Sequence, residues 1–125
     1  MRTQEVRNML TNFGKALRRI RLERDELLKD MSEKLGITPA YLSAIENGKK
    51  KATQSLCDRI IAEYQLQPDE TDMLMDAYFS TQDQVVIPTQ TMEESRQNLS
   101  VMFARKVNEI NEDDMAKILE ILKEI

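Results

Sequence analysis

Apolar residues recur at steps of three and four along almost the whole chain, and this spacing constrains the fold most strongly. It is the period of one face of an α-helix. Only three glycines and three prolines interrupt the pattern, so few positions favour a turn or a break. The sequence therefore predicts an all-α protein.

Cap and turn residues divide the first part of the chain into five helices. Threonine and asparagine side chains cap helix starts, proline suits the first helical position, and glycine ends helices. By these signals Asn12, Thr38 and Thr53 are expected to cap helices, and Gly36 to end one. We expect helices at residues 12–24, 28–35, 39–47, 54–65 and from Pro68 through Tyr78.

The pattern breaks between Ser80 and Thr91, where the sequence is STQDQVVIPTQT. Val85, Val86 and Ile87 are the only apolar run there, and the β-branched residues predict a short extended piece. Beyond this segment the helical period returns at residues 92–107 and 113–125. We therefore expect a domain at 1–80, a linker at 81–91 and a two-helix segment at 92–125.

Positive and negative charges are distributed unevenly along the chain. The whole chain has a net charge of −4, but residues 1–51 hold 12 Lys and Arg against 7 Asp and Glu, while residues 52–125 hold 6 against 15. The first part is therefore +5 and the rest −9. This asymmetry favours a partner with phosphates at the N-terminal part.

The residue types exclude several kinds of chemistry. The chain has no His and a single cysteine, Cys57, so neither an internal disulfide nor a His/Cys zinc site can form within it. Asp113 and Asp114 are paired carboxylates, but their place at a helix start is explained by the helix dipole. We expect no cofactor, no metal and no enzymatic activity, and a packed thiol at Cys57.

The helix that starts at Pro39 has an unusual outer face. Positions 39, 40, 43, 44 and 47 share one side of a helix, and they carry Pro39, Ala40, Ser43, Ala44 and Asn47. Such a helix fits the major groove of B-DNA, where small side chains let the backbone approach the base edges. We expect Tyr41 and the eight methionines to serve packing.

The segments FGKALRRIR, KDMSEKLGI and TPAYLSAIENGK resemble the lambda-repressor-like helix-turn-helix family, also called XRE or Cro/cI-like regulators. The resemblance covers residues 13–67 and implies a five-helix DNA-binding domain, to which the helices expected at 92–125 add a C-terminal helical extension. It implies that helix 39–47 is the recognition helix. The implied base-facing residues are Thr38, Pro39, Ala40, Ser43 and Ala44, and the implied phosphate contacts are Asn47, Lys49, Lys50 and Lys51.

The resemblance also implies a structural ion pair between Arg21 and Glu46. Such a pair contributes about 0 to 1 kcal/mol if it is exposed. The chain departs from the family at Leu27-Leu28, where a Ser-Gln pair is common, so that a glutamine contact to DNA is lost. Small residues also replace the polar base readers of the family on helix 39–47, which leaves more of the specificity to DNA shape.

The two C-terminal helices carry a wide apolar stripe. Because one helix-turn-helix contacts little DNA, proteins of this class commonly bind as dimers. Packing back on residues 1–80 would also cover the stripe, and both possibilities stay open. The residues expected at a dimer or partner surface are Leu99, Met102, Phe103, Ile118, Leu119 and Leu122.

These patterns together predict a dimeric, sequence-specific regulator of transcription that represses by binding double-stranded DNA. An alternative is an antitoxin-type protein whose acidic C-terminal helices bind a toxin while the N-terminal domain represses its own operon. The start of the chain lacks an apolar signal stretch and no long apolar run is present, so a cytoplasmic location without membrane contact is expected.

Overall fold

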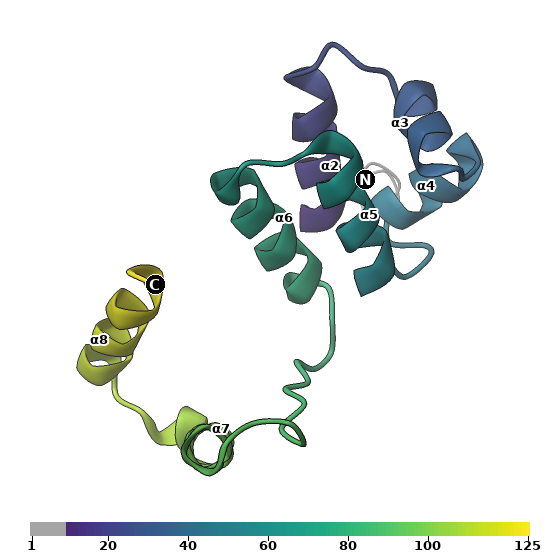
Figure 1. The fold of residues 1–125 in the computed structure, drawn as a ribbon. Coiled ribbons are helices and arrows are strands. Elements are labelled where there is room, and N and C mark those ends of the chain that lie inside the picture. Colours follow the sequence, from purple (N-terminus) through teal and green to yellow (C-terminus); the bar gives the residue numbers. More distant parts are fainter. Residues whose placement is uncertain (1–9) are drawn as a thin grey trace, which may run out of the picture. The chain divides into compact units, whose positions relative to one another are not determined.

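A computed structural model describes residues 10–125, and this part of the chain is all-helical (Figure 1). The all-α expectation is thus confirmed. The chain forms two compact units, one up to Val85 and one from Val86 onward. The helices are α2 (Asn12–Leu22), α3 (Leu28–Leu35), α4 (Pro39–Glu46), α5 (Gln54–Tyr64), α6 (Pro68–Ser80), α7 (Glu94–Lys106), the 3-10 helix η1 (Val107–Glu109) and α8 (Glu112–Lys123).

Side-chain caps fix where these helices begin. The hydroxyl of Thr38 accepts a hydrogen bond from the Tyr41 N–H at 3.0 Å, and that of Thr53 accepts one from the Leu56 N–H at 3.1 Å. At α2 the cap is Thr11, which accepts from the Gly14 N–H at 2.9 Å. Asn12, the cap expected from the sequence, is instead the first helical residue.

A glycine in the left-handed backbone conformation produces the turn between α3 and α4. Gly36 ends α3 with φ of 69°, a conformation that residues with a Cβ rarely adopt. The N–H of Ile37 then returns to the carbonyl of Ser32 at 3.0 Å. The chain can therefore start α4 at Pro39, with only Ile37 and Thr38 between it and Gly36, and α4 packs against α3.

The five helices from α2 to α6 enclose one apolar core. Helix α2 packs on α6 and α4, and α5 packs on α3 and α6. Cys57 is fully buried, and desolvation raises the pKa of its thiol to about 12. The buried apolar residues are Phe13, Ala16, Leu17, Ile20, Met31, Leu35, Leu42, Ile45, Leu56, Cys57, Ile60, Tyr64, Leu74 and Tyr78.

The second unit has no comparable interior. Residues 81–91 form neither helix nor strand, and no side chain of α7, η1 or α8 is buried. Asn111 caps α8 by accepting a hydrogen bond from the Asp114 N–H at 2.8 Å. No helix of the described chain is both long and apolar enough to span a bilayer.

Candidate nucleic-acid interface

Helix α4 presents one small, accessible face and one buried face. Leu42 and Ile45 enter the core, whereas Pro39 and Ala40 are exposed. Ser43, Ala44 and Asn47 are half-buried beside them, and Thr38 is exposed at the start of the helix. Tyr41, for which we expected a packing role, is 41% exposed and enlarges this accessible side.

The chain reverses direction after α4, and backbone hydrogen bonds hold the following lysines, Lys49 to Lys51, close to the helix. We call residues 48–51 the basic turn. Gly48 has φ of 79°, which allows a sharp reversal after Asn47. The N–H groups of Lys49 and Lys50 then donate to the carbonyl of Ala44 at 2.8 and 3.2 Å. These bonds fix the backbone of the basic turn relative to the outer face of α4.

The basic turn is well placed to accept an anion. Lys49, Lys50 and Lys51 are all exposed. Lys51 lies 3.7 Å from the carboxylate of Asp83, but both side chains are largely exposed, so a phosphate can displace this pair at little cost. Within residues 10–125 no ion pair engages Lys49 or Lys50.

Two side chains of α4 already bond to each other. The Asn47 amide donates to the Ser43 hydroxyl at 3.4 Å. The Ser43 hydroxyl can still donate its own hydrogen to an acceptor outside the protein, and the Asn47 carbonyl oxygen stays available. The structure thus brings the expected base-facing and phosphate-facing residues onto adjoining parts of one surface.

Helix α4 is held in place by the start of α2. The N–H and the hydroxyl of Thr11 both donate to the Glu46 carbonyl, each at 3.1 Å. A Cβ on Gly14 would lie 2.3 Å from that same carbonyl oxygen, so only glycine permits this approach. Neither residue was expected at this contact from the sequence. Thr11 carries a cap signal, but a weaker one than Asn12, and nothing in the local sequence links Gly14 to Glu46.

Arg21 and Glu46 form an ion pair between α2 and α4. The guanidinium contacts the two carboxylate oxygens at 2.5 and 3.2 Å, and both residues are buried. Arg21 also lies 3.4 Å from the Met31 sulfur. Because the pair is buried and doubly bonded, it determines the orientation of α4 more strongly than an exposed pair would.

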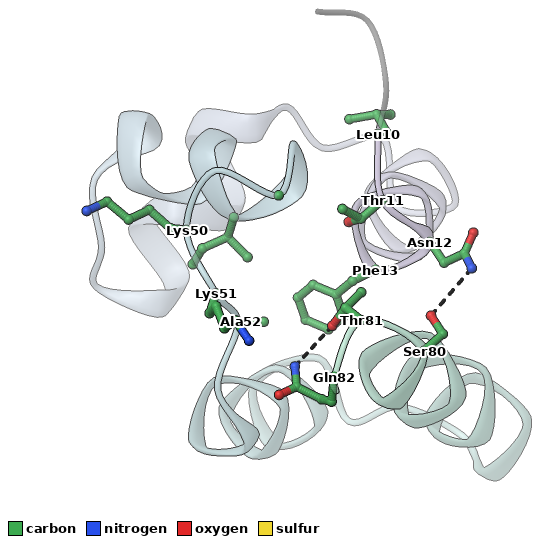
Figure 2. Close-up of a pocket in the computed structure, with 12 residues that line it drawn as sticks. Leu10, Thr11, Asn12, Phe13, Lys50, Lys51, Ala52, Ser80, Thr81 and Gln82 are labelled. Carbon is green, nitrogen blue, oxygen red and sulfur yellow. Dashed lines mark hydrogen bonds between the residues drawn. The ribbon is translucent and has the colours of Figure 1, made fainter. Parts of the chain in front are cut away.

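A hollow of about 430 Å³ lies beside the basic turn (Figure 2). Its walls come from the start of α2, the turn after α4 and the end of α6, with the Phe13 ring and Ile45 among the lining residues. Among the residues that line it, the Asn12 amide donates to the Ser80 hydroxyl and the Gln82 amide donates to the Thr81 hydroxyl. In Figure 2 the Lys50 side chain extends away from α2, so its ammonium group does not point into the hollow.

The residues expected at a dimer or partner surface belong to the C-terminal unit. Ile118 is half-buried. The other five are 41 to 70% exposed, namely Leu99, Met102, Phe103, Leu119 and Leu122.

The segment that contains α3 and α4 is similar to a known protein family. A family model described as helix-turn-helix matches residues 17–70, the span that contains the buried ion pair, α3, α4 and the basic turn. No curated protein and no solved structure matches the chain. Residues 17–70 therefore form a helix-turn-helix domain of the XRE, or lambda-repressor-like, family of DNA-binding regulators.

Proposed function

We propose that the protein is a sequence-specific regulator of transcription that binds double-stranded DNA as a homodimer and represses in the cytoplasm. The observation that carries this proposal is the joint geometry of α4 and the basic turn. The small outer face of α4 lies next to lysines that are anchored on its own Ala44 carbonyl. A domain family of DNA-binding regulators covers the same residues.

In the proposed complex α4 lies in the major groove. A helix is about 10–12 Å wide and the groove about 12 Å, so small side chains allow close approach. The methyl groups of Ala40 and Ala44 can contact thymine methyls, and Ser43 can hydrogen-bond a base edge. With only one hydroxyl among these three residues, much of the specificity would come from the shape and deformability of the operator.

The basic turn supplies the affinity for the phosphates in this proposal. Three lysine contacts per subunit give six per dimer, so the observed binding constant should fall with salt with a log–log slope of about −5. The same contacts are independent of base sequence, so they set the position of α4 on the duplex rather than its specificity.

Fluorescence anisotropy with duplexes from the region upstream of the gene tests the phosphate contacts. Lys49→Glu with Lys50→Glu should abolish binding to every duplex, because two unpaired ammonium groups become carboxylates that face phosphates. The matched control is Lys117→Glu with Lys123→Glu on α8, which changes the net charge equally and should leave low-salt binding in place. Equal affinities for the two variants would refute the role of the basic turn.

A companion variant tests base recognition by α4. Ala44→Gln adds a bidentate hydrogen-bonding group to the half-buried centre of the outer face. Selection from random duplexes should then return a changed preferred sequence, with adenine favoured at one position of each half-site. An unchanged selected sequence would place base recognition elsewhere.

A second candidate function is that of an antitoxin-type protein, in which α7 and α8 bind a toxin. The exposed apolar residues of these helices favour some partner, and residues 86–125 carry 8 acidic against 5 basic residues. This function predicts a co-purifying protein that is lost when the chain is truncated at Gln90. A homogeneous full-length homodimer would count against it.

A further inference from the structure

Most of the exposed large apolar side chains lie in the C-terminal unit. In residues 10–125, eleven of the fifteen belong to residues 86–125, whereas every buried core residue lies before Val86. Exposed apolar surface of this extent marks a site that another surface covers. The N-terminal unit needs no such cover, because its own helices enclose its core.

On each of the two helices several apolar residues form a stripe along one side, while the exposed Val101 lies on the opposite side of α7. On α7 they include Leu99 and Phe103, which are 70 and 41% exposed, and on α8 Leu119 and Leu122, at 48 and 55%. Within residues 86–125, all of which the structure describes, α7 and α8 are not packed against each other. Neither helix therefore covers the stripe of the other in the same chain.

The charges of the unit favour a second copy as the partner. The last turn of α7 carries Arg105 and Lys106, and the first turn of α8 carries Glu112, Asp113 and Asp114. Within residues 86–125 the structure pairs only Arg96 with Glu93, at the other end of α7. A surface with a basic patch and an acidic patch complements itself under a two-fold axis, whereas a uniformly acidic surface would need a basic partner.

We propose that residues 86–125 form a homodimerisation unit in which α7 of one copy packs antiparallel on α8 of a second copy. Antiparallel packing places the basic end of α7 beside the acidic start of the other α8, and it aligns the two apolar stripes. The two-fold axis repeats this contact, so both helices of both copies are covered. The proposal deepens the proposed function, because it assigns the interface of the proposed dimer.

Sedimentation equilibrium of the full-length protein without DNA tests the interface. The wild type should have a mass of about 29 kDa, twice the 14.5 kDa of one chain. Leu119→Gln with Leu122→Gln should raise the dimer dissociation constant about 100-fold or more, because four leucines leave each interface. The matched control, Glu120→Gln with Glu124→Gln, places glutamine on the opposite side of α8 and at its C-cap, and should remain dimeric.

A charge-exchange experiment tests the antiparallel packing. One variant carries Arg105→Glu and Lys106→Glu, and the other carries Glu112→Lys and Asp113→Lys, which leaves the Asn111–Asp114 cap intact. Each variant alone should be weakened at low salt. An equimolar mixture should form a heterodimer as stable as the wild type, because both basic-to-acidic contacts are restored. A mixture no stronger than its components would overturn the antiparallel arrangement.

The outcomes separate this inference from the DNA-binding function. A wild-type monomer at 50 μM, or a monomer that forms a stable dimer only with a different protein, overturns the homodimerisation unit. Far-UV circular dichroism must show wild-type helicity in the Gln variants, and a loss of helicity without loss of mass would also count against it. The Lys49→Glu with Lys50→Glu variant should keep the mass of a dimer although it no longer binds DNA. Failure of the DNA-binding proposal can therefore be told apart from failure of the dimerisation proposal.

Discussion

Arg21 and Glu46 are the two charged residues buried in the core that the described helices enclose. Removing both charges from water costs several kcal/mol, which the ion pair and its two hydrogen bonds largely offset. The net gain in stability over an apolar pair is therefore small. What the pair contributes is orientation, since its planar geometry joins α2 to the last residue of α4.

Glu46→Ala should lower the free energy of unfolding by about 3–5 kcal/mol, because it leaves the Arg21 guanidinium buried without a counter-charge. Urea unfolding followed by circular dichroism measures this loss. The double variant Arg21→Met with Glu46→Leu replaces the pair by apolar groups and should recover most of it. A loss below about 1 kcal/mol for Glu46→Ala would mean that water reaches the site.

At the scale of single residues, the sequence predicts which side chains interact better than it predicts how buried they are. The Arg21–Glu46 pair follows from the family resemblance, but its burial depends on how α2 and α4 pack, which no local pattern states. The exposure of Tyr41 also depends on helix packing. Its position on α4 is clear from the sequence, whereas its exposure depends on the neighbouring helices.

At the scale of elements, a second ion pair links α6 to the turn after α2. Glu70 lies in the first turn of α6 and accepts two hydrogen bonds from Arg24, both at 3.1 Å. The hydrogen bond from Arg24 lowers the pKa of the Glu70 carboxyl from its ordinary value near 4.5, although partial burial acts in the opposite direction. A group with a lowered pKa stabilises the fold only while it is ionised.

The stability contributed by Glu70 should therefore be complete above its unfolded-state pKa near 4.5 and should be lost as the pH falls through the lower folded-state value. Urea unfolding between pH 7 and 3 measures the change. Glu70→Gln should be less stable at pH 7 and should lose less stability on acidification than the wild type. Parallel pH profiles for the two proteins would show that the Arg24 contact does not stabilise the ionised carboxyl.

Helix boundaries depend on contacts that a periodic pattern records only in part. Gly36 and Thr38-Pro39 mark the turn between α3 and α4, because a left-handed glycine and a cap leave few alternatives. The start of α7 is different. The apolar period predicts a start at Met92, but the Met92 N–H and the Gln97 amide both bond to the Thr89 carbonyl, so that a turn occupies this stretch and the helix begins at Glu94.

At the scale of the whole molecule, the charge asymmetry matches the proposed division of labour. Residues 1–51 are +5 and residues 52–125 are −9. Positive charge lies where we propose phosphate contacts, and the acidic remainder keeps non-specific binding to DNA weak. Sequence alone predicts this division, but it cannot predict that α7 and α8 leave their apolar stripes uncovered by each other.

A two-fold protein should select a two-fold site. We expect an inverted repeat with half-site centres about 34 Å apart, one helical turn of B-DNA, since each copy contributes one α4. Selection of random duplexes followed by hydroxyl-radical footprinting measures both symmetry and spacing. The Leu119/Leu122 variant should protect single half-sites with lower affinity. Selected sites without internal symmetry would contradict binding by a symmetric dimer.

The approach of Gly14 to the Glu46 carbonyl restricts how this protein can be engineered. A library of variants that seeks new operators would vary the outer face of α4. The position of that helix, however, depends on the absence of a Cβ at Gly14 of α2. A redesign that slides or tilts α4 to reach other bases would open a gap at Gly14 or collide there. New specificities are therefore more accessible through exchanged side chains than through a repositioned helix.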